Sequence, residues 1–254
     1  MADGSWSVAW ITGGSSGIGR ELARQLDGVV GHVAVTARSA DKLGELCAAS
    51  RTVFGYPGDV TDADAMAGCV GEIESHAGPI DLAILNAGAW ALMDATDLDL
   101  AAVRTGVEVN YLGVMNALDV LIPKMMARGK GHIAIVASVA GYRGLPRSVA
   151  YGPTKAALNN LAETLKLELE PHGITVSVIN PGFVDTPMTA ENPFPMPGII
   201  SAKDAAERIL KGLRRGRFEI AFPTGFILAM KLLRLLPDAV YFPLVRKFAV
   251  RGRG

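Results

Sequence analysis

The chain has few of the residues that mark secreted, metal-binding or nucleic-acid-binding proteins. Only two cysteines, Cys47 and Cys69, occur in 254 residues, and neither has metal-ligand spacing or matching histidines. We therefore expect no disulfide scaffold and no metal site, but a reduced, cytoplasmic protein. Lys and Arg number 25 and Asp and Glu also 25, so no basic field favours nucleic acid. The first residues lack a basic start and a long apolar run, and predict no secretion signal.

Apolar runs alternate regularly with helical stretches along the chain. Half of the residues are hydrophobic, which is enough for a large core. Strands are predicted at 7–12, 32–36, 52–56, 82–85, 132–137, 175–179 and 218–222, with helices between them such as 18–26, 62–76 and 155–170. Strands that are apolar throughout and alternate with helices are typical of a doubly wound parallel sheet. The sequence predicts one α/β domain of the Rossmann type over residues 1–222, with a basic, apolar extension at 223–254.

A glycine-rich turn follows the first predicted strand. The segment Thr12-Gly-Gly-Ser-Ser-Gly-Ile-Gly19 leads directly into a helical pattern. Its glycines allow a tight turn and a close approach to a ligand, and free N–H groups at the helix start can bind a pyrophosphate. The spacing differs from the common G-x-G-x-x-G fingerprint, and a tight turn without a ligand is the alternative interpretation.

The end of the second predicted strand indicates which dinucleotide would bind. A carboxylate there would bind the ribose 2′-hydroxyl of NAD(H), whereas a guanidinium would pair with the 2′-phosphate of NADP(H). The chain has Ala37-Arg38 at this point, and Asp41 comes later, where it and Ser39 are better placed to begin a helix. NADP(H) is therefore predicted in preference to NAD(H). The alternative is that Arg38 is a solvated surface residue.

Three side chains near the fifth predicted strand indicate chemistry. Ser138 follows the apolar run 132–137, so its hydroxyl is expected at the carboxyl edge of the sheet. Tyr151 and Lys155 lie four residues apart at a helix start, on one face. A phenol can protonate the oxygen of a carbonyl that receives a hydride, and a nearby ammonium and an oxidised nicotinamide would lower its pKa for the reverse reaction. The pattern predicts a carbonyl reductase or alcohol dehydrogenase.

These motifs together resemble those of the short-chain dehydrogenase/reductase family over nearly all of residues 7–222, in the subgroup with the TGxxxGxG turn and the YxxxK motif. The resemblance implies a catalytic tetrad of Asn110, Ser138, Tyr151 and Lys155. By this resemblance Tyr151 is the general acid/base and Ser138 holds the substrate carbonyl. Lys155 also binds the nicotinamide ribose, and Asn110 supports a water that leads to Lys155.

The resemblance also implies a cofactor-binding set. Its members are Gly13, Ser15, Ser16, Gly17, Ile18, Gly19, Arg38, Asp59, Val60, Asn86, Ala87, Gly88, Tyr151, Lys155, Pro181, Gly182, Val184 and Thr186. Two of them have other interpretations, because Asp59 could be a helix cap and Asn86 a turn residue with a left-handed backbone. The departures from the family pattern, at Gly14, Leu85, Pro153 and Thr154, remove no functional atom.

The substrate is less well defined by the sequence. Residues expected to line its pocket are Val139, Ala140, Tyr142, Arg143, Leu145, Ala89, Trp90, Met188 and the loop 183–200. The methionines, phenylalanines and prolines of this loop suggest an apolar lid. We expect a lipophilic ketone or aldehyde, or its alcohol, as substrate. The alternatives are an NAD-dependent alcohol dehydrogenase and a non-catalytic NADPH-sensing protein.

The charge is divided unevenly along the chain. Residues 203–254 hold 12 Lys and Arg and 4 Asp and Glu, a net of +8, whereas residues 1–202 have a net of −8. The apolar segment 222–237 is too short and too charged to span about 30 Å of hydrocarbon. It could lie in a membrane interface, dock on the substrate cleft or form a subunit interface. Helices at 110–126 and 155–170 resemble the family's dimer interface, so a homodimer or homotetramer is expected.

Overall fold

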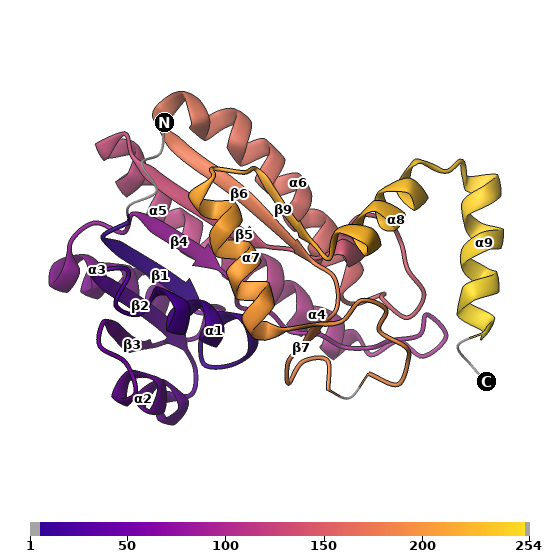
Figure 1. Cartoon of the computed structure of the whole chain (residues 1–254), viewed down its shortest axis with the longest axis horizontal. Helices are drawn as coiled ribbons and strands as arrows, with labels where there is room; N and C mark the ends of the chain where they lie inside the picture. The colour runs from indigo at the N-terminus through magenta and orange to yellow at the C-terminus, as the bar shows by residue number, and fades with distance from the viewer. Residues whose placement is uncertain (1–5, 191, 252–254) are drawn as a thin grey trace.

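A seven-stranded parallel sheet forms the centre of the molecule, with helices on both faces (Figure 1). The computed structural model describes residues 6–190 and 192–251. The strand order is β3-β2-β1-β4-β5-β6-β9. The strands are β1 (Val8–Thr12), β2 (His32–Ala37), β3 (Val53–Pro57), β4 (Leu82–Leu85), β5 (Gly131–Val136), β6 (Ile174–Pro181) and β9 (Glu219–Phe222). Two short strands, β7 (Val184–Asp185) and β8 (Ile200–Ser201), pair separately. The predicted doubly wound sheet is confirmed.

The helices pack against the sheet through two buried clusters, one on each face. On one face lie α3 (Ala63–Ala77), α5 (Gly113–Arg128) and α6 (Gly152–Leu169), and on the other α1 (Gly17–Leu26), α2 (Ala40–Ala48) and α7 (Ala202–Arg214). Successive residues of β1 alternate between them, with Trp10 in the first cluster and Ile11 in the second. Because both faces are covered, all five residues of the strand are buried and all but the last, Thr12, are apolar.

The order of the strands determines where a crevice opens. From β1 the chain proceeds outward through β2 to β3, then returns to β4 on the other side of β1. Connections leaving the carboxyl ends of β1 and β4 therefore turn in opposite directions, and open α/β sheets bind ligands at such a point. Short helical elements lie beside this edge, namely α4 (Leu100–Val107), the π-turn Glu108–Leu112 and the 3-10 turn Val139–Gly141. A further 3-10 turn, Glu170–His172, precedes β6.

The chain ends in α8 (Thr224–Leu235) and α9 (Asp238–Arg251). α8 buries Ile227 and Met230 against Val139 and Tyr142, just after Ser138. α9 projects beyond the helices that cover the sheet (Figure 1). No helix of the described segments is long and apolar enough to cross a membrane.

Arg143 joins these two helices to the segment after Ser138. Its Nη1 donates to the carbonyls of Leu233 (3.1 Å) and Leu236 (2.6 Å), and so binds the C-terminal end of α8. The guanidinium also pairs with Asp238 and lies 3.7 Å from the centre of the Tyr241 ring. Arg143 was expected in the substrate pocket, and this interpretation is wrong: its donors are occupied by the C-terminal helices.

His132 gives a pH dependence to the stability of the sheet. The side chain is buried in β5, where a ring nitrogen lies 2.9 Å from the Ser177 hydroxyl oxygen. Because that hydroxyl donates to the Arg217 carbonyl, the neutral imidazole acts as the donor to serine. Burial lowers the pKa of His132 from 6.5 to about 4.

We predict that the free energy of unfolding falls as the pH drops from 6.5 to about 4. Over this range the unfolded chain binds a proton that the folded chain does not, at a total cost of about 3 kcal/mol. His132→Gln keeps a donor for Ser177 but does not titrate, so its stability should depend less steeply on pH. Denaturant unfolding at several pH values measures this, and equal slopes for the two proteins would contradict the assignment.

Candidate active site

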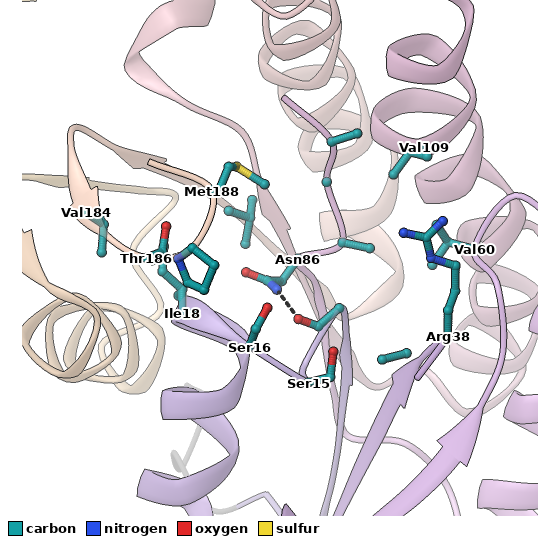
Figure 2. Close-up of a pocket in the computed structure, with 18 of the residues that line it drawn as sticks. Ser15, Ser16, Ile18, Arg38, Val60, Asn86, Val109, Val184, Thr186 and Met188 are labelled. Carbon is teal, nitrogen blue, oxygen red and sulfur yellow. Dashed lines mark hydrogen bonds between the residues drawn. The ribbon is translucent and has the colours of Figure 1, made fainter. Parts of the chain in front are cut away.

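A cavity of about 510 Å³ opens at the carboxyl ends of β1, β4 and β5. It brings together most of the residues predicted from the sequence. These are Gly13, Ser15, Ser16, Gly17, Ile18, Arg38, Asp59, Val60, Asn86, Ala87, Gly88, Ser138, Tyr151, Lys155, Pro181, Gly182, Val184 and Thr186. Figure 2 shows Arg38 at one side of the cavity near Val60, and Thr186 and Met188 at the other. Gly19 and Asn110 are not among the lining residues.

The glycine turn is bonded to the end of β4. The Thr12 hydroxyl oxygen accepts the backbone N–H groups of Asn86 (3.0 Å) and Ala87 (3.2 Å). In return the Asn86 amide donates to the carbonyls of Thr12 and Gly13, both at 3.1 Å. A Cβ on Gly19 would lie 2.6 Å from this amide nitrogen. The side chain of Asn86 therefore holds the turn in place.

Gly13 occupies a position that no other residue fits. Its φ is +68°, and a Cβ there would lie 2.7 Å from the Cα of Ala87. L-residues rarely adopt this backbone conformation, and the neighbouring atom belongs to the backbone and cannot move aside easily. The turn is consequently packed directly on β4.

The N-terminus of α1 is available to an anion. The hydroxyl of Ser16, its N-cap residue, makes no capping hydrogen bond, whereas side chains of Ser39, Asp62 and Ser201 cap α2, α3 and α7. The first turn of α1 contains no acidic residue. Unpaired N–H groups and the positive end of the helix dipole thus face the cavity, and they fit a pyrophosphate.

Lys155 is buried beside Tyr151 at the start of α6. Its Nζ donates to the carbonyl of Val136 at 2.9 Å and lies 5.5 Å from the centre of the Tyr151 ring. The lysine side chain is only 3% exposed, and burial lowers its pKa to about 8. Part of the ammonium charge is therefore balanced by a strand carbonyl rather than by a carboxylate.

Tyr151 and Ser138 face one another across the cavity wall. Burial raises the pKa of Tyr151 to about 12, and a side-chain hydrogen bond with Ser138 partly opposes this. The Ser138 hydroxyl oxygen also accepts the N–H of Ala140 at 3.2 Å. The sequence argument expected a lowered tyrosine pKa, but in the protein alone the desolvation of the phenolate raises the pKa by more than the Ser138 hydrogen bond lowers it. At neutral pH the phenol is protonated.

Asn110 lies in the π-turn between α4 and α5 and is fully buried. Its amide oxygen accepts the N–H of Ala89 at 2.7 Å. Its amide nitrogen donates to the Ala89 carbonyl (2.9 Å) and the Thr154 hydroxyl (3.0 Å). The side chain therefore ties the segment after β4 to the first turn of α6, where Lys155 lies.

The structure decides between the two interpretations of Asp59 and adds Lys42 to the residues that line the cavity. Asp59 accepts hydrogen bonds from the N–H (3.0 Å) and hydroxyl (2.9 Å) of Thr61, while Asp62 caps α3, so Asp59 is not the cap. Lys42 lines the cavity with Arg38 and was not predicted. Its position four residues after Arg38, in the first turn of the next helix, is the signal that could have identified it.

The expected substrate residues are divided between several places. Val139, Ala140, Tyr142, Arg143 and Leu145 do not line the main cavity. Tyr142 instead donates to the carboxylate of Glu219 at 2.5 Å. A second cavity of about 220 Å³ adjoins Tyr151 and is lined by Ala89, Trp90, Ala91, Ala102, Thr105, Gly106 and Ala150. Met188, from the 183–200 loop, does line the main cavity.

Comparison with known proteins places this arrangement in a family. Residues 7–194 match the family model for short chain dehydrogenases. The chain belongs to this family. The dehydrogenase is 36% identical to an uncharacterized oxidoreductase of Myxococcus xanthus over 97% of this chain and 99% of that protein. It is 31% identical to a ketoacyl reductase of a Nostoc species over 83% and 76% of the two chains.

A solved structure supports the same assignment. The crystal structure of a short chain dehydrogenase from Burkholderia cenocepacia in complex with NADP matches with a TM-score of 0.82 and 26% identity. The match covers 95% of this chain and 98% of that one. This dehydrogenase is thus an oxidoreductase of a family that binds NAD(P). The uncapped start of α1 and the closely packed glycine turn fit such a dinucleotide.

We predict that Gly13→Ala weakens binding of NADPH or NADH at least tenfold, because the added methyl group displaces Ala87 and the turn. Gly28→Ala is the matched control, since Gly28 has a φ of +70° but no atom within 4 Å of an added Cβ. It should lose only roughly 1–2 kcal/mol of stability through backbone strain. Fluorescence titration and denaturant unfolding measure both variants. Equal cofactor affinity in the two would show that the contact with Ala87 is unimportant.

Proposed function

We propose that the protein transfers a hydride between NADP(H) and a lipophilic ketone or aldehyde, or the corresponding alcohol. The observation that carries this proposal is the meeting of Ser138, Tyr151 and the buried Lys155 on one wall of the cavity, with the free N-terminus of α1 on another. NADP(H) in this cavity would supply or accept the hydride. The residues then have to hold the substrate oxygen and move one proton.

Tyr151 is proposed as the general acid and Ser138 as its partner. The serine hydroxyl positions the substrate oxygen, and the protonated phenol gives its proton to that oxygen as the hydride arrives at carbon. With a pKa of about 12 the phenol is a donor throughout the neutral range, which favours carbonyl reduction. Lys155, held by the Val136 carbonyl, would stabilise the phenolate that remains. Asn110 would act as a positioning residue for this lysine.

Arg38 and Lys42 support a preference for NADP(H). Arg38 is exposed at the end of β2, and no residue of the described segments forms an ion pair with it. Lys42 and Ser39 line the same wall. Two cations beside a hydroxyl suit a phosphate better than a ribose 2′-hydroxyl. The NADP-bound Burkholderia structure agrees with this preference.

The second cavity supports an apolar substrate. It adjoins Tyr151 and is walled mainly by alanines and Trp90, without a charged side chain. An apolar group next to the reacting carbonyl would be accepted there, whereas a carboxylate or a sugar would lose hydration without compensation. The ketoacyl reductase name of the Nostoc relative also favours a carbonyl substrate.

Tyr151→Phe should lose about a hundredfold or more of the turnover, because the general acid is removed. Its affinity for NADPH should stay within about twofold of that of the unchanged protein, since the ring remains. Steady-state kinetics on a panel of apolar ketones and aldehydes, with a fluorescence titration, measures both. Normal turnover in this variant would refute the assigned role. Tight NADPH binding without turnover by the unchanged protein would favour the non-catalytic alternative.

Arg38→Asp should reduce the ratio of NADPH to NADH affinity at least tenfold, since a charge-assisted phosphate contact is replaced by a repulsive one. Arg215→Asp makes the same charge change at an exposed position outside the cavity and should leave the ratio unchanged. Quenching of tryptophan fluorescence, with Trp90 beside the site, reports binding. An unchanged ratio in Arg38→Asp would make this arginine a surface charge and support the NAD-dependent alternative.

A further inference from the structure

α8 is apolar on two opposite faces, and the described chain covers only one of them. Ile227 and Met230 are buried against the segment after Ser138. Leu228, Leu232 and Leu235, at positions i, i+4 and i+7, are 60%, 57% and 79% exposed. Residues with this spacing form one stripe along a helix. Three outward leucines within about two turns of helix therefore form an apolar surface that the described residues leave uncovered.

α9 carries two further exposed apolar side chains. Val240 and Phe242 are 50% and 52% exposed. We call these two residues and the three leucines of α8 the C-terminal patch. It lies at the end of the molecule where α8 and α9 project from the sheet (Figure 1). The two helices that carry the patch therefore stand away from the helices that cover the sheet (Figure 1).

The charges around the C-terminal patch are almost all positive. Residues 224–251 contain five Lys and Arg and a single acid, Asp238. Asp238 is paired with Arg143, which leaves no unpaired carboxylate on these helices. Arg234, Arg246 and Lys247 are exposed, and none forms an ion pair within the described segments. Apolar side chains thus stand beside uncompensated cations.

We propose that the C-terminal patch binds an anionic lipid surface, with the leucines in the headgroup region and the cations against lipid phosphates. An apolar helix face with flanking Lys and Arg binds in this way without crossing the bilayer. A second copy of the chain fits less well, because a two-fold contact would bring the same cations together without acids to pair them. Charge complementarity therefore selects the anionic surface.

The position of α8 gives this binding a consequence for the site. α8 packs on Val139 and Tyr142, and its Phe226 ring lies 5.6 Å from the Phe183 ring at the start of the 183–200 loop. Both segments adjoin the proposed catalytic residues. A membrane surface at α8 would therefore lie near segments that flank Ser138 and the cavity, and any use of this position in admitting a lipophilic substrate rests on the proposed function. Lipid binding itself does not require that function.

Vesicle flotation of the full chain tests the proposal. We expect binding to phosphatidylcholine vesicles that contain phosphatidylglycerol, little binding to pure phosphatidylcholine, and release by high salt. The triple variant Leu228→Gln, Leu232→Gln, Leu235→Gln should bind the anionic vesicles at least tenfold more weakly. The matched control is Leu98→Gln, Leu100→Gln, Leu167→Gln, whose leucines are 63%, 61% and 77% exposed elsewhere. It should bind like the unchanged protein.

A second pair of variants separates charge from apolar contact. The triple variant Arg234→Gln, Arg246→Gln, Lys247→Gln removes three cations. Its binding to the anionic vesicles should be weaker by about fivefold for each removed charge that lies near the lipid. The matched control, Lys211→Gln, Arg214→Gln, Arg215→Gln, removes the same charge from the last turn of α7 and its C-cap residue and should have little effect. Circular dichroism and NADPH titration confirm that each variant is folded, and they report on the cofactor site independently of lipid.

Three results would overturn the proposal. The first is no binding of the unchanged protein to anionic vesicles at low salt. The second is equal binding by the α8 leucine variant and its control. The third is an oligomer in light scattering that the α8 leucine variant converts to a monomer while lipid binding stays unchanged, because a second copy would then cover the patch.

Discussion

The site depends on one constraint: the connections that leave the carboxyl ends of β1 and β4 turn in opposite directions. Helices cover both faces of the sheet, so a ligand can reach backbone groups only where the connections leave in opposite directions. Hydrogen bonds among Thr12, Asn86 and the backbone of Gly13 join the two strands at this point. They fix the start of α1 so that its unpaired N–H groups face the cavity, where they can bind an anion.

The buried ammonium of Lys155 is the costly element of the site. Removing a cation from water is unfavourable unless fixed dipoles or counter-charges replace the water. The Val136 carbonyl provides one such dipole, and the clamp made by Asn110 and Thr154 fixes the first turn of the helix that carries the lysine. The same low-dielectric surroundings keep Tyr151 protonated. A site of this kind is prepared for proton donation, and a negative charge developing nearby would be stabilised strongly.

The C-terminal helices connect this interior to the surface. One face of α8 packs against the segment after Ser138, and Arg143 secures the junction between α8 and α9 through the carbonyls at the end of α8 and the ring of Tyr241. A half-buried, multiply bonded arginine at this junction fixes how the two helices project. The outward leucines and unpaired cations therefore have a defined orientation relative to the cavity wall that holds Ser138.

The sequence alone determined the strands, the helix that follows the glycine turn, and the residue types at the ends of β1, β2, β4 and β5, because alternating burial and turn chemistry act over a few residues. It also identified the serine, tyrosine and lysine of the site. Only the tertiary structure showed that Asn86 binds the glycine turn and that Lys42 lines the cavity beside Arg38. It also showed that Arg143 binds the end of α8 instead of lining the cavity. It also decided that burial raises the pKa of Tyr151 by more than its hydrogen bond with Ser138 lowers it. These outcomes depend on which segments meet, as with Arg143 and Leu236, which are far apart in the sequence. Only the packed fold fixes such distances and the dielectric surroundings of each charge.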